Sequence, residues 1–411
     1  MYQALYRKYR PRSFSDDVFD VAGQEHITET LRRQIIADRL SHAYLFVGTR
    51  GTGKTTCAKI LSRAVNCLDN TDGNPCNKCI SCIGIEDGSI LDVLELDAAS
   101  NNGVDDVRAM RDEAIYSPVS VNKRVYIIDE VHMLSTPAFN ALLKILEEPP
   151  GHIIFILATT ELHKVPATIL SRCQKFSFKR LSSEEIKNRL LKIASEEELK
   201  LTDEAAEKLA ILADGSMRDG ISLLDQCVGS KEINLEHVLE TIGLAGEEEI
   251  IQMMQALSSR NITALLEVLN NLYADGKDMA ALLNELTGFI RDMLIVNISP
   301  DSLLIGTGAS RTGLSELSKN FTNERLLYCL GTLKEAMLTI SRGGMSRLTL
   351  EICLIRMCDE ALSDDSAALA SRIKKLEANS NNTTNTASKE SDDNELNPLD
   401  RLSSFEIVNF G

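Results

Sequence analysis

The sequence predicts an α/β domain with a parallel sheet, followed by helical domains. Three observations support this fold class. Over roughly the first 180 residues, short apolar runs alternate with helical patterns, as in a parallel sheet covered by helices. A glycine-rich loop separates the first apolar run from a helical pattern. From Ser182 to about residue 362, apolar positions recur only at helical spacing.

Four apolar runs are predicted to be buried strands of the sheet. The helical patterns between these runs are expected to cover its faces. The runs are AYLFV (43–47), ILDVLEL (90–96), RVYIID (124–129) and HIIFILAT (152–159).

The helical part is predicted to contain two domains. Ser182 and Glu185 form a capping box at its first helix, and glycines mark several helix stops. A later helical block without obvious chemistry is interpreted as a packed bundle, and the polar tail is expected to be disordered. The expected organisation is an α/β core, a small helical domain, a helical bundle and a tail, at residues 1–179, 180–243, 244–363 and 364–411.

Composition limits the classes of function. The net charge of −16 over 411 residues argues against a surface that coats DNA nonspecifically, since phosphate affinity comes mainly from Lys and Arg. No window approaches the roughly 18 apolar residues of a membrane span, and the N-terminal segment lacks the apolar run of a signal peptide. We therefore expect a cytoplasmic protein without a membrane partner, whose ten cysteines are reduced.

The glycine-rich loop has the spacing of a phosphate-binding loop. Backbone N–H groups of such a loop can surround a triphosphate, while its lysine reaches the β/γ oxygens and its threonine ligates Mg²⁺. A degenerate loop that binds nucleotide without turnover is the alternative. The predicted nucleotide-binding residues are Gly48, Thr49, Arg50, Gly51, Thr52, Gly53, Lys54, Thr55 and Thr56, with Lys54 also catalytic and Thr55 also a magnesium ligand.

Two acidic residues follow one another at the end of the third apolar run. Asp129 is suited to hold Mg²⁺ through its water shell, and Glu130 to polarise an attacking water. Acidic residues at this place can also simply cap the following turn. Given the loop upstream, the pair favours hydrolysis over binding alone.

Four cysteines lie close together at Cys67, Cys76, Cys79 and Cys82. Their spacing lets the thiolates wrap one tetrahedral zinc ion, and four ligands leave no open position for water, so such a site is structural. A disulfide is disfavoured in a reducing compartment. The spacing alone leaves an iron–sulfur cluster open as an alternative.

Five longer motifs stand out along the chain. They are GTRGTGKT (48–55), IIDEVHML (127–134), FNALLKILEEPP (139–150), LATTELHKVPATILSRCQKF (157–176) and GSMRD (215–219). Together they resemble the AAA+ clamp-loader ATPases, and among these most closely the gamma/tau subunits of bacterial DNA polymerase III. The resemblance implies a P-loop AAA+ domain with a zinc module inserted at 67–82, then a helical lid and a helical collar for oligomerisation.

The resemblance also implies roles for three further residues. Thr160 would be the polar sensor that orients the attacking water, with Thr159 as its nearest competitor. Arg172 would be an arginine finger acting in the neighbouring subunit's site, and Arg218 a second sensor reaching from the lid to the phosphates. The simpler interpretations are a strand-end threonine, a cation at a helix C-terminus and a surface arginine paired with an aspartate.

The adenine pocket is implied to begin at Tyr9, Arg10 and Pro11. Downstream of Pro11 the chain is about four residues longer than the family pattern, so that either Val18 or Val21 would pack against the base. A rigid strap around the core would also use an Arg-Pro pair.

The cofactors implied by the resemblance are ATP, Mg²⁺ and Zn²⁺. The implied partners are other clamp-loader subunits, the sliding clamp and primed DNA, with residues 100–108 binding DNA phosphates through a helix N-terminus. An Asn/Gly turn with capping aspartates is the simpler interpretation of that segment. Whether the tail contacts the polymerase or the helicase stays open.

The expected function is that of an ATP-hydrolysing motor subunit, which is not the polymerising subunit itself. It would open the sliding clamp and place it on primed DNA as part of the DNA polymerase III holoenzyme. A DNA-translocating AAA+ motor of the branch-migration type is the alternative. A non-enzymatic scaffold subunit is disfavoured because Lys54, Thr55, Asp129 and Glu130 are all present.

Overall fold

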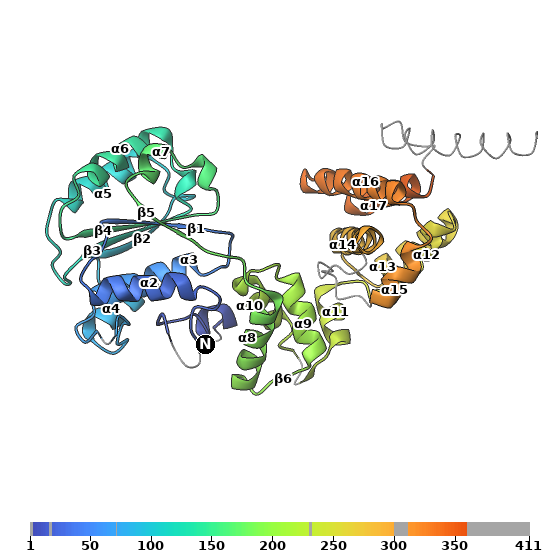
Figure 1. The fold of residues 1–411 in the computed structure, drawn as a ribbon, viewed down its shortest axis with the longest axis horizontal. Coiled ribbons are helices and arrows are strands. Elements are labelled where there is room, and N and C mark those ends of the chain that lie inside the picture. The colour runs from blue at the N-terminus through green and yellow to red at the C-terminus, as the bar shows by residue number, and fades with distance from the viewer. Residues whose placement is uncertain (1–2, 16–18, 71, 230–231, 300–310, 360–411) are drawn as a thin grey trace, which may run out of the picture. The chain divides into compact units, whose positions relative to one another are not determined.

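The chain forms two compact units, Met1–Leu244 and Ala245–Gly411 (Figure 1). The computed structural model describes residues 3–15, 19–70, 72–229, 232–299 and 311–359. Val18 and the tail at 364–411 lie outside the described residues. Within the described residues, no helix is long and apolar enough to cross a membrane. The finer domain boundaries stay predictions.

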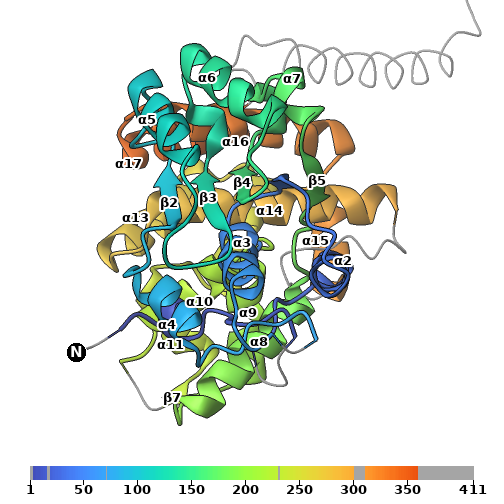
Figure 2. The same ribbon diagram turned by 90° about the vertical axis from the view of Figure 1, so that its left-hand side faces the viewer.

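A five-stranded sheet is the centre of the first unit. Its order is β2-β3-β4-β1-β5, and every neighbouring pair is parallel. Figure 2 shows the edge strands β2 and β5 on opposite sides, with β3 and β4 between them. This sheet with its covering helices confirms the predicted fold class. The strands are β1 (Ala43–Val47), β2 (Val93–Asp97), β3 (Arg124–Asp129), β4 (Ile153–Thr159) and β5 (Gln174–Ser177).

The edge strand β5 is not among the predicted strands. Of its four residues only Phe176 is buried, and the others are exposed or half-buried. A segment this short and polar gives no apolar run, so its strand conformation depends on pairing with β1.

Alternate side chains of β1 belong to two different cores. Tyr44 and Phe46 pack with the helices on one face, and Ala43 and Leu45 with those on the other. This period of two is the normal alternation of a strand. Figure 1 shows α2 (Glu25–Ile36) and α3 (Lys54–Val65) on the first face, and α5 (Val104–Ala114), α6 (Thr136–Glu147) and α7 (Ala167–Leu170) on the second.

The remainder of the first unit is mainly helical. The predicted capping box is confirmed, because the Glu185 N–H donates to Ser182 Oγ at 3.2 Å and the Ser182 N–H donates to the Glu185 carboxylate at 2.7 Å. The helices are α8 (Ser183–Glu196), α9 (Asp203–Leu212), α10 (Met217–Gln226) and α11 (Leu235–Ile242). A parallel pair, β6 (Lys200–Leu201) and β7 (Glu232–Ile233), corrects the purely helical expectation.

The N-terminal helix α1 (Leu5–Lys8) packs against α10. Leu5 and Tyr9 belong to the same apolar core as Ile186 and Leu224. The Leu5 N–H also donates to the carboxylate of Asp225 at 3.3 Å. Residues 5–9 are therefore held by the small helical part.

The second unit is a helical bundle around one apolar core. This agrees with the prediction of packed helices whose apolar positions recur at helical spacing. Its helices are α12 (Glu247–Ser258), α13 (Ile262–Ala274), α14 (Met279–Ile298), α15 (Arg311–Ser318), α16 (Asn323–Ser341) and α17 (Ser346–Cys358).

Candidate nucleotide site and cysteine cluster

The phosphate loop connects the carboxyl end of β1 to the start of α3. Gly51 and Gly53 have φ values of +76° and +100°, which residues with a side chain rarely adopt. Helix α3 begins at Lys54, so its first backbone N–H groups face the loop. A loop of this kind at a helix N-terminus can bind phosphate without any additional cation.

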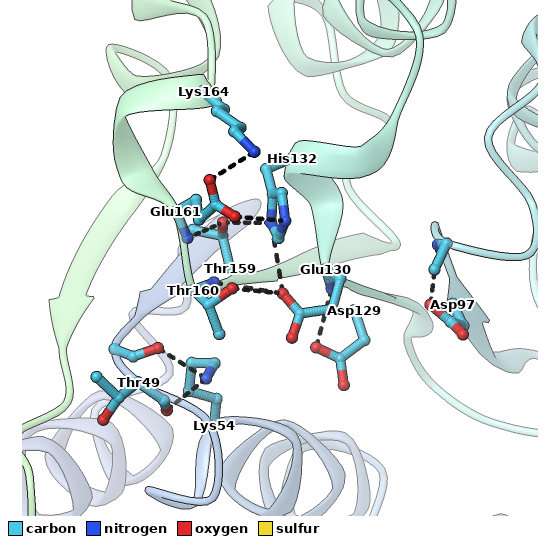
Figure 3. A network of polar contacts seen from close by, with 12 residues as sticks. Thr49, Lys54, Asp97, Asp129, Glu130, His132, Thr159, Thr160, Glu161 and Lys164 are labelled. Carbon is cyan, nitrogen blue, oxygen red and sulfur yellow. Dashed lines mark hydrogen bonds and ion pairs between the residues drawn. The ribbon is translucent and has the colours of Figure 1, made fainter. Parts of the chain in front are cut away.

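Lys54 is buried beneath this loop. Its Nζ donates hydrogen bonds of 2.8 Å to the carbonyl oxygens of Gly48 and Thr49 (Figure 3). Burial lowers the pKa of the Lys54 ammonium group, and the carboxylates of Glu130 and Asp129 offset this only in part, so that the pKa stays below its usual value. The ammonium group is therefore held against the loop by the carbonyl dipoles of Gly48 and Thr49.

Thr55 and Asp129, the two predicted magnesium ligands, are in contact. Thr55 Oγ1 donates to Asp129 Oδ2 at 2.7 Å, and the Glu130 N–H donates to the other carboxylate oxygen at 2.9 Å. Hydroxyl and carboxylate oxygens are the ligand types that Mg²⁺ prefers. The donor set at the ends of β3 and the phosphate loop therefore fits this ion.

Glu130 lies beside Thr160, which directly follows β4. Thr160 Oγ1 donates to Glu130 Oε2 at 3.0 Å, and the Thr160 N–H lies 3.4 Å from the same oxygen (Figure 3). Thr159 is fully buried, and its hydroxyl contacts His132 instead. Of the two threonines, Thr160 is thus the one that meets Glu130.

Arg172 contacts residues of its own neighbourhood rather than the phosphate loop. Its guanidinium pairs with Glu147 at 2.7 Å and donates to the Thr168 carbonyl at 2.8 Å. The structure therefore does not bring Arg172 together with Lys54, which is compatible with a role in another subunit's site.

Arg218 lies on α10 with its guanidinium over the ring of Tyr6, 5.1 Å from the ring centroid. Asp214, an aspartate near it in the sequence, pairs with Arg180. Two residues before Arg218, Ser216 caps α10 and lies against Gly51 of the phosphate loop. Arg218 is thus two residues from a contact with the phosphate loop, but its own side chain is stacked on Tyr6.

The residues predicted for the adenine pocket are divided between two parts of the first unit. Arg10 Nε donates to Thr56 Oγ1 at 3.1 Å, whereas the Tyr9 hydroxyl donates to Glu197 at 2.6 Å. Val21 is buried, and a Cβ placed on Gly53 would lie 3.3 Å from its Cγ1. Val21 therefore lies directly beside the phosphate loop.

The four predicted cysteine ligands converge. Their sulfur atoms all lie within 4.8 Å of one another, with Cys76 and Cys82 at 4.0 Å. Zinc–sulfur bonds of about 2.3 Å in a tetrahedron place the sulfurs about 3.8 Å apart, so the spacing fits a single ion. The cluster precedes and enters helix α4 (Ile80–Asp87), to which Cys82 belongs.

Backbone groups around the cluster favour thiolates. The Cys76 N–H points to Cys67 Sγ at 3.2 Å, and the Cys82 N–H points to Cys79 Sγ at 3.4 Å. Burial raises the pKa of the Cys79 thiol, but the N–H groups of Leu68 and Cys82 and the neighbouring thiols outweigh this and lower it to about 6. Burial raises the pKa of the Cys82 thiol. A cation among the four sulfurs would favour the ionised form of all of them.

Two residues at the site were missed by the sequence analysis. His132 lies between Glu130 and Thr159, and Ser216 lies against Gly51. Both fall inside the quoted motifs IIDEVHML and GSMRD, which is the only signal that marks them.

Three family models match successive parts of the chain. Residues 23–182 match "DNA polymerase III, delta subunit", and residues 185–230 match "DNA polymerase III clamp loader subunit, ATPase lid domain". Residues 233–373 match "DNA polymerase III subunits gamma and tau domain III". The three matches together extend across both units of the chain.

Among curated proteins, the chain is similar to DNA polymerase III subunit tau of Bacillus subtilis. The two are 44% identical over 92% of this chain and 68% of the relative. The Escherichia coli subunit tau is 37% identical over 86% of this chain and 55% of that protein. The chain thus spans between about half and two thirds of the length of these relatives.

The matches among solved structures are more distant in sequence. The Thermotoga maritima RuvB Holliday junction branch migration motor is 20% identical over 66% of this chain and 86% of that one, with a TM-score of 0.44. The Bacillus subtilis DNA clamp loader delta protein is 15% identical over 80% of this chain and 99% of that one, with a TM-score of 0.35. From the sequence relatives and the family models, the chain belongs to the gamma/tau family of DNA polymerase III clamp-loader subunits.

Proposed function

We propose that the chain is an ATP-hydrolysing motor subunit of a clamp loader, which opens a sliding clamp and places it on primed DNA in the cytoplasm. The observation that carries this proposal is that Lys54, the Thr55–Asp129 pair and the Glu130–Thr160 pair all lie at the carboxyl ends of the central strands β1, β3 and β4. These are the groups that a phosphoryl-transfer site needs, and all of them belong to the first unit.

The phosphate loop would hold the triphosphate, and residues near Thr56 and Val21 the base. Arg10 contacts Thr56, and Val21 lies against Gly53, so both reach the loop from the N-terminal segment. On binding, Lys54 would exchange the carbonyl oxygens of Gly48 and Thr49 for phosphate oxygens. Because these carbonyls already hold the ammonium group at the loop, little reorientation is needed.

Thr55 and Asp129 would hold Mg²⁺, which supplies charge neutralisation at the phosphates when bound. Glu130 would accept a proton from the attacking water, and Thr160 would orient that water. The Thr160 hydroxyl donates to Glu130 Oε2, so the two proposed partners are adjacent.

The remaining assigned residues would couple turnover to neighbours. Arg172 would act in the adjacent subunit's site. In its own subunit its guanidinium contacts Glu147 and Thr168 rather than the phosphate loop. Arg218 would leave the Tyr6 ring and reach the phosphates, moving α10 and the lid with it. In this proposal residues 1–179 are the ATPase core, 180–243 the lid and 244–363 the collar that binds other subunits.

The cysteine cluster would hold a structural zinc ion. Four sulfurs at this spacing satisfy a tetrahedral ion and leave no position for water. The ion would order a segment that has few apolar residues of its own, and its ligands would affect turnover only through folding or assembly.

The decisive experiment measures ATP hydrolysis with the sliding clamp and primed DNA, together and separately. Stimulation by both beyond the sum of the separate effects is the expected result, and Lys54→Ala should abolish it. Stimulation by junction DNA without the clamp would instead support a translocating motor. Absence of hydrolysis under all conditions would contradict the proposal.

A further inference from the structure

His132 lies in the short helix η1 (Val131–Met133), which directly follows Glu130. Its side chain is only 6% exposed, although the imidazole ring is polar. A buried polar side chain normally has hydrogen-bond partners, since leaving it without them costs free energy. The partners of this ring are therefore informative.

One ring nitrogen faces two residues of the proposed hydrolytic site. His132 Nδ1 lies 3.0 Å from Thr159 Oγ1 and 3.4 Å from Glu130 Oε2 (Figure 3). An ionised carboxylate can only accept hydrogen bonds, so a favourable contact with Glu130 requires a hydrogen on Nδ1. The Nδ1–H then donates to Thr159 Oγ1, and the Glu130 carboxylate lies beside it at ion-pair distance.

The contacts converge on one oxygen of the Glu130 carboxylate. Thr160 approaches Oε2 with its hydroxyl and its N–H, and His132 approaches the same atom from helix η1. With Oε2 held in this way, Oε1 is the oxygen that can accept from water. Glu130 itself has a φ of +47°, a conformation that is strained for a side chain of this size, so its direction depends on such contacts.

The other side of the ring faces a second carboxylate. His132 Nε2 lies 3.7 Å from Glu161 Oε1, and the other Glu161 oxygen pairs with Lys164 at 2.6 Å. The Glu161 N–H donates to Thr159 Oγ1 at 3.0 Å. Thr159 and Glu130 therefore meet the ring at Nδ1, and Glu161, in the turn after β4, lies at Nε2.

We propose that His132 is a positioning residue: its Nδ1–H ties the Glu130 carboxylate to Thr159, so that the free carboxylate oxygen faces the attacking water. This role rests on the proposed hydrolysis. It predicts that the atom at the Nδ1 position matters for turnover, whereas the atom at the Nε2 position does not.

The test compares His132→Asn with His132→Gln in the full chain. The amide nitrogen of Asn takes the Nδ1 position and that of Gln the Nε2 position. We expect kcat to fall about tenfold or more for H132Q, whereas H132N stays within about threefold of the unchanged chain. The ATP dissociation constant, measured by equilibrium binding, should stay within about twofold for both, because neither contacts the phosphate loop.

A packing role would give a different pattern. It would lower the thermal stability of both variants alike and leave turnover per bound nucleotide unchanged. If H132Q does not fold, Thr159→Val is the second variant, because it keeps the shape of the other partner and removes its hydroxyl. It should lower kcat with unchanged nucleotide affinity.

A readout without nucleotide completes the test. Long-range ¹H–¹⁵N spectra of the nucleotide-free chain should show a hydrogen on His132 Nδ1, and Glu130→Gln should shift that resonance but not those of the exposed His163. Three results would overturn the inference: an Nδ1 without hydrogen, an H132Q enzyme with unchanged kcat, or parallel losses of kcat and affinity. If the protein without substitutions does not hydrolyse ATP, that result counts against the proposed function. The spectra would still test the contact between His132 and Glu130.

Discussion

Met217, the first residue of α10, donates its backbone N–H to the carbonyl oxygen of Gly51 at 3.1 Å. The residue before it, Ser216, packs so closely on the loop that a Cβ at Gly51 would lie 1.8 Å from its Oγ. The tip of the phosphate loop therefore touches the helix that carries Arg218. A displacement of either one must be accommodated by the other.

Gly51→Ala should separate the loop from α10. The new methyl group cannot fit against Ser216, so we expect α10 to move and ATP affinity to fall about tenfold, which corresponds to ~1.4 kcal/mol. Gly88→Ala is the matched control. Gly88 has a nearly equal φ of +78°, but an added Cβ would meet nothing within 4 Å.

Both substitutions carry the same backbone cost of about 1 kcal/mol for a left-handed residue, so both should lower thermal stability slightly. Only Gly51→Ala should weaken nucleotide binding, measured by equilibrium titration. Equal affinities for the two variants would show that the contact with Ser216 has no part in binding.

Arg172→Ala should lower turnover about 10³-fold or more while ATP affinity is kept, since a finger supplied by a neighbour is worth this much in related chemistry. Mixing gives a sharper test. Subunits with Arg172→Ala and subunits with Glu130→Gln should each be inactive alone, but regain part of the activity together. In the mixed assembly some interfaces join an intact Glu130 to an intact Arg172.

The control for this experiment is Glu147→Gln, which removes the charge that Arg172 contacts in its own subunit. It should leave turnover within about threefold, because a half-exposed ion pair contributes little. If mixing restores nothing although both variants assemble, Arg172 does not act across an interface.

The buried centre of the fold was predictable because its signals are local. Strands β1, β3 and β4 are continuous apolar runs, as expected for strands covered on both faces. Strand β5 has only one buried residue, and β6 and β7 have two residues each, so their conformation depends on pairing partners far away in sequence.

The same distinction applies to the site. The phosphate loop and the four cysteines are compact motifs whose spacing carries the chemistry. The stacking of Arg218 on Tyr6 joins residues at distant positions, and no local pattern announces it. Which of Thr159 and Thr160 meets Glu130 depends on how the chain turns at the end of β4, because neighbouring side chains of a strand point in opposite directions.

In metal-free protein, iodoacetamide should modify Cys79 before the other cysteines. Its pKa of about 6 makes it mostly thiolate at pH 7, and the thiolate is the reactive form. The rate should therefore decline as pH falls through about 6. Cys57 should not react, since burial raises its pKa and denies access to the reagent.

Added zinc should protect Cys79 and raise thermal stability, as followed by peptide mass spectrometry and by melting. One zinc per chain is the expected content. Unchanged labelling of Cys79 in the presence of zinc would contradict the metal site, whereas a coloured, iron-containing preparation would favour an iron–sulfur cluster.

A buried ion pair anchors the loop that precedes β3. Arg124 and Asp92 are 7% and 6% exposed and are joined at 2.8 Å, and Asp92 also accepts the N–H groups of Val119 and Ser120 at 2.9 and 2.8 Å. Asp92→Asn removes the buried counter-charge of the guanidinium, and the remaining carboxylate, that of Glu113, is half-exposed and lies 3.7 Å away. Breaking a buried ion pair typically costs about 3–5 kcal/mol. The loop should open, and the amides of Val119 and Ser120 should exchange hydrogen much faster.

This effect should depend on pH. Burial raises the pKa of Asp92, but the Ser120 N–H, the Arg124 guanidinium and the Val119 N–H outweigh it and hold the pKa below its usual range. A carboxyl whose pKa is lowered on folding contributes stability that is complete above its ordinary pKa of about 3.9 and is lost as pH falls through the folded value. Protection of the two amides should thus exceed that of the variant down to about pH 4, and the difference should shrink below it.

Asp92 directly precedes β2 and Asp97 is the last residue of this strand, so Asp97→Asn is the matched control. Asp97 is exposed and accepts only local N–H and hydroxyl groups, including the Ala99 N–H at 2.9 Å, among the described contacts. Its substitution should leave exchange at Val119 and Ser120 unchanged at every pH, because it does not touch the buried pair. If Asp92→Asn likewise left these amides protected, the ion pair with Arg124 would not be what holds the loop to the sheet.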